Sequence, residues 1–122
     1  VIDEILKMRV AGFDFEFAGN EVNLQVLSGK ELGDRFLGFG CVDSNNPSVE
    51  RVPVIKKRIQ AGIEAFGPDQ LLVDPDCGLR MLTREVAFQK LKAMVDAARQ
   101  ARVEYTDAIP RDSSWRPPGC SP

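Results

Sequence analysis

Carboxylate and thiol side chains recur at the ends of three short apolar segments of this sequence. They are Asp14 and Glu16 in the first segment, Cys41 and Asp43 in the second, and Asp74, Asp76 and Cys77 in the third. Carboxylate oxygen is a hard ligand and thiolate sulfur a soft one, and zinc accepts both. If the three segments end at one place in the fold, these side chains predict a metal or catalytic site there.

Each of these residues also has a purely structural interpretation. Asp43 could begin a turn, and Asp74 and Asp76, which flank a proline, could be turn residues. Cys41 stands within an apolar run, where a cysteine usually behaves as a small buried hydrophobe. Residue types and spacing alone leave the functional and the structural interpretations open.

The elements that would position these residues alternate along the chain. Apolar runs predict strands at 13–17, 35–42 and 70–73, and helical periodicity predicts helices at 2–8, 22–33, 52–66 and from an N-cap at Thr83 to about 103. Alternating strands and helices predict an α/β fold with a parallel sheet and right-handed crossovers. Ligands bind at the carboxyl ends of the strands in such folds, where the acidic and thiol residues lie.

Two helices have clear apolar stripes. In 52–66 the stripe consists of Val52, Ile55, Ile59, Ile63 and Phe66, with Gly62 beside it. In the last helix the expected buried stripe consists of Ala87, Leu91, Met94, Val95 and Ala98. The strands repeat every 25 to 33 residues or so, which matches a (β/α)8 barrel of about 250 residues divided by eight. Three such repeats cannot close a barrel, so the sequence predicts an incomplete TIM barrel with three βα units.

The amino-acid composition argues against several classes of function for this chain. Of 122 residues, 43% are hydrophobic and 28% are charged, with 16 basic and 18 acidic side chains, as in an ordinary globular domain. Without a basic stripe we expect no nucleic-acid partner, and without a long apolar run we expect no membrane span. The three cysteines form no CxxC pair, which favours a reduced cytoplasmic setting over a disulfide framework. Histidine is absent, so the chain cannot by itself carry Ser-His-Asp or Cys-His nucleophilic catalysis.

The start of the sequence and the unpaired edges of the expected sheet predict a piece of a larger protein. The chain opens on Val1 within a helical pattern, and three apolar strands would leave both sheet edges unpaired. Four of the eight prolines fall in the last 13 residues. We therefore expect a partial barrel at 1–105, a disordered tail at 106–122, and a missing N-terminal part of the barrel as a possible partner.

Three segments carry a resemblance to a known family. Pro75-Asp-Cys-Gly-Leu79, Leu37-Gly-Phe-Gly-Cys-Val-Asp43 and the helical segment 84–98 resemble the C-terminal catalytic region of cobalamin-independent methionine synthase. The resemblance is greatest to the shorter archaeal and bacterial relatives that consist of the barrel alone. It implies a zinc ion that activates a substrate thiol, with Cys77 and Glu16 as zinc ligands. The family's other ligands, a His-x-Cys pair, would lie upstream of Val1.

The resemblance also implies the reaction. The expected function is zinc-dependent transfer of a methyl group from a methylated folate-type donor to the thiol of homocysteine, in the manner of a 5-methyltetrahydropteroyltriglutamate-homocysteine S-methyltransferase. The small-molecule thiol and the methyl donor would be its partners. The family usually continues Lys-Thr-Arg after PDCGL, where this chain has Arg80-Met-Leu-Thr-Arg84. This departure keeps two alternatives open: alkyl transfer to another thiol such as coenzyme M, or a truncated barrel half that is inactive alone.

Overall fold

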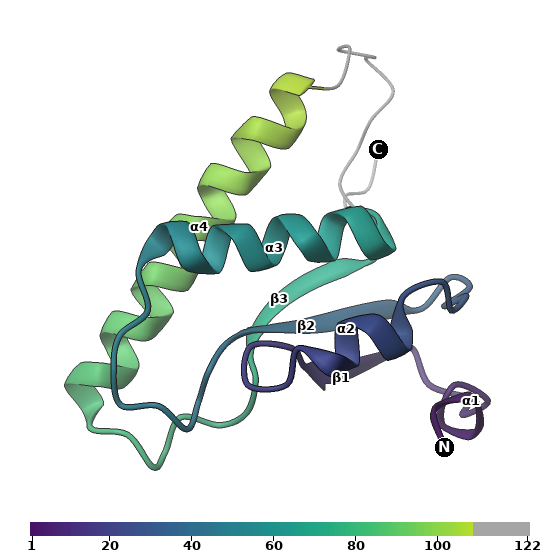
Figure 1. Cartoon of the computed structure of the whole chain (residues 1–122), viewed down its shortest axis with the longest axis horizontal. Helices are drawn as coiled ribbons and strands as arrows, with labels where there is room; N and C mark the ends of the chain where they lie inside the picture. Colours follow the sequence, from purple (N-terminus) through teal and green to yellow (C-terminus); the bar gives the residue numbers. More distant parts are fainter. Residues whose placement is uncertain (109–122) are drawn as a thin grey trace.

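The computed structural model describes residues 1–108 and contains one parallel three-stranded sheet (Figure 1). The strands are β1 (Gly12–Glu16), β2 (Phe36–Val42) and β3 (Leu71–Pro75), in the spatial order β1-β2-β3. The helices are α1 (Ile2–Ile5), α2 (Val22–Leu27), α3 (Val52–Phe66) and α4 (Arg84–Ala108). The α/β fold with a parallel sheet is confirmed, and each strand is separated from the next by a helix.

The middle strand shows why the sheet forms. Leu37, Phe39 and Cys41 are almost completely buried beneath the helices, and Phe39 stacks on Phe17 with ring centroids 4.2 Å apart. Gly38 and Gly40 occupy the alternate positions, which face the other side of the sheet. They pair with Asp14 and Glu16 of β1, respectively. The helix-facing side of β2 is therefore a core surface, and its opposite side has room for carboxylates from the neighbouring strands.

Helix α3 has the predicted bounds and the predicted buried face. Ile55 and Ile59 are buried, and Pro53 lies in the first turn, where its missing N–H had no intrahelical partner. A Cβ on Gly62 would lie 3.0 Å from the ring of Phe39. Gly62 thus lets α3 approach the sheet closely, as expected from its place beside the apolar stripe.

The buried face of α4 differs from the predicted stripe. Of the predicted residues only Met94 is buried, whereas Leu91 and Val95 are 39% and 41% exposed. The face that packs in the core consists of Lys90, Ala93, Met94, Ala97 and Ala101. Small alanines let α4 pack closely, so the inner face is less hydrophobic in sequence than its flank. The stripe that hydrophobicity alone predicts therefore lies on that flank and not on the buried face.

Other boundaries shift near the ends of elements. The first two helices are shorter than predicted. Helix α1 ends at Ile5. Helix α2 ends at Leu27, just before a turn through Gly29, which has φ +82°. Strand β3 continues to Pro75. Helix α4 runs to Ala108, so residues 106–108 of the expected tail are helical. The rest of that expected tail, 109–122, lies outside the described residues.

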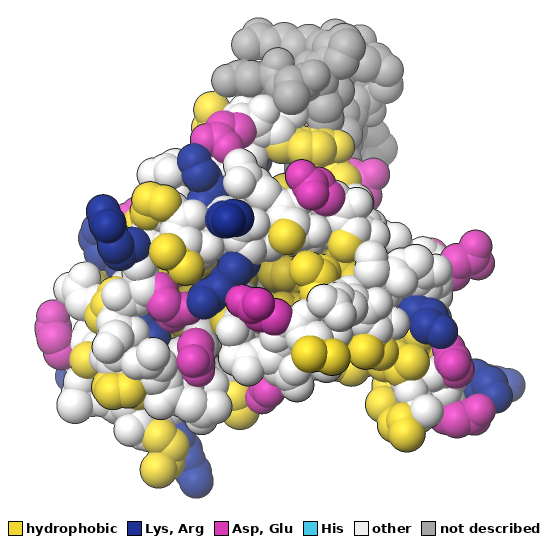
Figure 2. Space-filling view, viewed as in Figure 1, with side chains coloured by type: hydrophobic (Ala, Val, Ile, Leu, Met, Phe, Trp, Pro, Cys, Tyr) yellow, Lys and Arg dark blue, Asp and Glu magenta, His cyan; other side chains and the backbone are white. Residues whose placement is uncertain are grey.

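The surface is mixed in character. Acidic, basic and apolar side chains are interspersed on the face shown in Figure 2. The exposed large apolar side chains include Leu72 in β3, and Met81 and Phe88 near the start of α4. Among residues 1–108, no helix has both the length and the apolar character needed to cross a membrane.

Candidate functional site

The carboxyl ends of β1 and β3 are joined by the side chain of Asp76. Its Oδ1 accepts hydrogen bonds from the backbone N–H groups of Phe17 and Ala18 at 3.1 and 3.0 Å, and its Oδ2 accepts one from Gly19 at 2.6 Å. The N–H of Asp76 itself donates to the carbonyl of Val42 at 2.8 Å. One residue of the loop after β3 therefore contacts both other strands just where they end. We call this arrangement the Asp76 clamp.

A glycine in the middle strand makes the Asp76 clamp possible. A Cβ on Gly40 would overlap Oδ1 of Asp76 and would stand 2.8 Å from the carbonyl oxygen of Phe15. The carbonyl of Gly40 also accepts the N–H groups of Phe17 and Ala18, at 3.1 and 3.0 Å. Only a residue without a side chain lets the two loops meet across β2.

The two predicted zinc ligands flank the Asp76 clamp. Glu16 is the last residue of β1 and precedes the first N–H donor, while Cys77 directly follows Asp76. Both side chains are exposed, and Cys77 is a free thiol. The fold thus brings the Glu16 and Cys77 segments to the same end of the sheet.

The donor chemistry suits zinc, but this part of the chain does not complete a site. A thiolate and a carboxylate are two of the ligand types that zinc accepts, and a zinc site needs three or four protein ligands. Within residues 1–108, no three Asp, Glu or Cys side chains lie close enough together to hold a metal ion. A metal site that includes Cys77 and Glu16 would therefore need further ligands besides these two.

The structure gives Cys41 and Asp43 structural roles. Burial raises the pKa of Cys41 to about 12, so this residue stays a protonated thiol at neutral pH. Its small buried side chain confirms the interpretation as a core residue. Oδ1 of Asp43 accepts the N–H of Asn45 at 2.9 Å, as expected for a residue that begins a turn.

Asp14 and Asp74 meet on the open side of the sheet, over Gly38. A Cβ on Gly38 would overlap the Asp14 carboxylate and would lie 2.7 Å from Oδ2 of Asp74. Burial, then the negative charge of Asp14 and its hydrogen bond, raise the pKa of Asp74. Burial and the nearby negative charge both disfavour the charged form of Asp74.

A buried ion cluster near the end of β2 was not anticipated from the sequence. Oε1 of Glu50 accepts a hydrogen bond from Nζ of Lys90 at 3.0 Å, and Oε2 pairs with the guanidinium of Arg58 and accepts the N–H of Asp43 at 3.2 Å. Lys90 is fully buried. Glu50 thereby ties the loop after β2 to both α3 and α4. The signal in the sequence was Lys90 in helical register with Ala93, Ala97 and Ala101.

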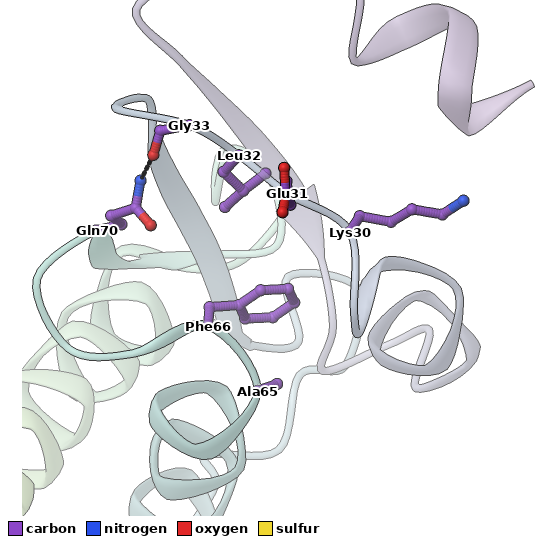
Figure 3. Close-up of a pocket in the computed structure, with 7 residues that line it drawn as sticks. All are labelled: Lys30, Glu31, Leu32, Gly33, Ala65, Phe66 and Gln70. Carbon is purple, nitrogen blue, oxygen red and sulfur yellow. Dashed lines mark hydrogen bonds between the residues drawn. The ribbon is translucent and has the colours of Figure 1, made fainter.

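The hollow shown in Figure 3 lies at the opposite end of the sheet. Its volume is about 330 Å³, and it is lined by Lys30, Glu31, Leu32, Gly33, Ala65, Phe66 and Gln70. These residues belong to the segments that lead into β2 and β3, and the side-chain amide of Gln70 donates to the carbonyl of Gly33. In parallel α/β barrels this end contributes to stability, whereas chemistry occurs at the carboxyl ends of the strands. The Asp76 clamp lies at the carboxyl ends of the strands, opposite this hollow.

Comparisons with known proteins agree with the fold and the motifs. The family model described as the catalytic domain of cobalamin-independent synthase matches residues 1–100. A methionine synthase of Methanothermobacter marburgensis is 51% identical over 98 residues, which cover 80% of this chain and 32% of that protein. A methionine synthase of Methanocaldococcus jannaschii is 41% identical over 112 residues, covering 84% and 35%. The chain therefore spans about a third of the length of these relatives.

A solved structure shows the same fold. A B12-independent methionine synthase from Shewanella sp. W3-18-1, in complex with selenomethionine, superposes with a TM-score of 0.79 at 19% identity. The match covers 88% of this chain and 31% of that one. The three-stranded sheet of this chain therefore has the fold of three βα units of a TIM barrel, and the chain belongs to the cobalamin-independent methionine synthase family.

Proposed function

We propose that these residues are the last three βα units of a zinc-dependent methyltransferase that makes methionine. The methyl group would pass from a methylated folate-type donor to the thiol of homocysteine. Membership of the family supports this reaction class. The observation that carries the proposal is the exposed thiol of Cys77, which the Asp76 clamp ties to the strand end that bears Glu16.

In this proposal Cys77 and Glu16 are two of the zinc ligands. Bound zinc supplies a position at which a substrate thiol is held as thiolate, the nucleophilic form of sulfur. Cys77 contributes a thiolate sulfur, and Glu16 contributes a carboxylate oxygen from the end of a strand. Glu16 ends β1 and Cys77 closely follows β3, and anchoring on rigid strands helps a set of metal ligands to keep its geometry. A reducing compartment such as the cytoplasm suits an exposed cysteine that must remain a free thiol.

The remaining ligands belong to the part of the barrel that these residues do not supply. The chain contains no histidine, and residues 1–108 offer no third ligand near Cys77 and Glu16. Two ligands on an open sheet give little control over the position of a substrate thiol relative to a methyl donor. We therefore expect residues 1–122 alone to be inactive, and a complete barrel that carries them to be active.

The proposal is tested with the complete barrel, the methylated folate donor and homocysteine. Cys77→Ala should abolish turnover, because it removes a zinc ligand. Cys41→Ala removes a buried thiol on the same sheet and should leave turnover close to the unmodified level. Full turnover of the Cys77→Ala variant would overturn the assignment. Turnover with coenzyme M but not with homocysteine would instead favour the alternative of alkyl transfer to another thiol.

A further inference from the structure

The Asp76 clamp concentrates an unusual number of bonds on one side chain. Both carboxylate oxygens are used, and the three donors are consecutive backbone N–H groups. Successive N–H groups that point at one anion form a strong binding arrangement, because each bond is charge-assisted. The clamp also spans 57 to 59 positions in sequence, so it holds together two loops that the chain itself does not connect closely.

The loop beyond the Asp76 clamp has little else to position it. Residues 78–83 form neither helix nor strand, and α4 begins at Arg84, seven positions after Cys77. In the part of the chain that the structure describes, Asp76 makes the only hydrogen bonds between residues 76–83 and the segment after β1. Beyond the pairing of the strands and the bond from the Asp76 N–H to Val42, this carboxylate is therefore what links the segment of Cys77 directly to that of Glu16.

We propose that Asp76 is a positioning residue that fixes Cys77 and Glu16 at the separation a shared metal ion requires. The inference rests on the proposed zinc function and adds to it a residue that does not itself touch the metal. Partners that orient ligands from outside the coordination sphere are typically worth about 10- to 100-fold in metal affinity. A role limited to stability would instead weaken folding and leave the geometry of the bound metal unchanged.

The informative substitution is Asp76→Asn. It keeps the shape of the side chain but replaces one oxygen with an NH2 group, which cannot accept a hydrogen bond. Whichever way the amide is turned, at least one backbone donor among Phe17, Ala18 and Gly19 loses its bond to residue 76 and faces another donor. The clamp should loosen without a gross change in volume.

The experiment uses the complete barrel with Co²⁺ in place of zinc. The thiolate-to-cobalt charge-transfer band reports the bonds between cysteine sulfur and the metal, and the part of it that Cys77→Ala removes reports the Cys77–metal bond. Competition with a chelator reports affinity. Asp76→Asn should lower affinity by about 10- to 100-fold, and its charge-transfer band should shift or weaken. Asp69→Asn removes the same charge from an exposed residue at the other end of β3, and Ile59→Val weakens the core in α3. Both control variants should have the same metal affinity and the same charge-transfer band as the protein without substitutions.

The outcomes separate this inference from the function on which it rests. An Asp76→Asn protein with unmodified affinity and an unmodified band would overturn the positioning role. An unmodified protein without a thiolate–cobalt band, or a Cys77→Ala variant whose band and affinity are undiminished, would instead overturn the zinc assignment.

A second measurement needs no variant and applies even if Asp76→Asn fails to fold. Because coupling between two sites is reciprocal, bound zinc should tighten the Asp76 clamp and slow hydrogen exchange at the N–H of Gly19. Exchange at Gly19 that is the same with and without zinc, in a protein shown to bind zinc, would contradict the proposal.

Discussion

Glu50 is expected to contribute more to stability than any surface ion pair of this chain. Its side chain is 13% exposed, and its partner Lys90 is 0% exposed. Truncation in the Glu50→Ala variant leaves a buried ammonium unpaired and removes the partner of Arg58 and of the Asp43 N–H. Breaking a buried pair on one side typically costs about 3–5 kcal/mol, and we expect a loss in that range.

Urea denaturation, monitored by circular dichroism, measures this loss as the change in the free energy of unfolding. The control variant is Glu4→Ala, whose pair with Lys7 has both side chains at least 70% exposed. Such surface pairs contribute at most about 1 kcal/mol. A double variant, Glu50→Ala with Lys90→Met, should recover much of the loss, because it removes the buried charge as well.

Two results would refute this reasoning. One is a Glu50→Ala variant that loses no more stability than Glu4→Ala, which would mean that water or another group satisfies Lys90. The other is a double variant no more stable than Glu50→Ala alone, which would show that the unpaired ammonium is not the source of the loss.

Three further predictions follow from the sheet and its cysteines. Gly40→Ala should destabilise the protein by about 1–3 kcal/mol in urea denaturation, because its Cβ meets backbone that cannot easily move. Alkylation followed by peptide mass mapping should label Cys77 in the native protein and Cys41 only after unfolding, because Cys41 is buried with a pKa raised to about 12. Asp74→Asn should raise stability at neutral pH and lose this advantage in acid, as measured by unfolding at several pH values. The raised pKa of Asp74 means that the folded state favours its protonated form, so ionisation beside Asp14 opposes folding as pH rises.

Each of these predictions has a contradicting outcome. Unchanged stability of Gly40→Ala would show that the two loops can separate without cost. Native labelling of Cys41 at the rate of Cys77 would contradict its burial. A gain from Asp74→Asn that persists unchanged in acid would show that the gain does not come from removing the ionised form of Asp74.

The parts of the fold set by periodicity could be predicted well from sequence. Helix 52–66 was predicted with its observed bounds, because a wide apolar stripe, a proline in the first turn and a glycine at the end all agree. The strands were located to within two residues at each end, since β2 is apolar on both faces and the others are bounded by turn residues. Ends of short helices were less accurate, because few residues define them.

The inner face of α4 could not be predicted from hydrophobicity. Its buried positions include Lys90, whose charge is compensated by Glu50 from a distant segment. Such compensation depends on a tertiary contact between residues that are 40 positions apart in the sequence. The alanines beside Lys90 are weakly hydrophobic, so the more apolar flank with Leu91 and Val95 gave the stronger signal.

The candidate site was predictable in its residue types and its location, but not in its internal connections. Parallel strands place their carboxyl ends together, so the sequence predicts Glu16 and Cys77 at the same end of the sheet. Asp76 was noted only as a strand-end carboxylate or a turn residue. Its partners are backbone N–H groups, which carry no side-chain signature in a sequence.

The assignment of Cys77 as a zinc ligand is tested most directly by zinc K-edge X-ray absorption on the complete barrel. Zinc–sulfur bonds give a scattering shell at about 2.3 Å, distinct from the shorter bonds to nitrogen and oxygen. We predict that Cys77→Ala lowers the bound zinc and removes one sulfur from this shell, whereas Cys41→Ala changes neither. Stoichiometric zinc with an undiminished sulfur shell in the Cys77→Ala protein would contradict the assignment.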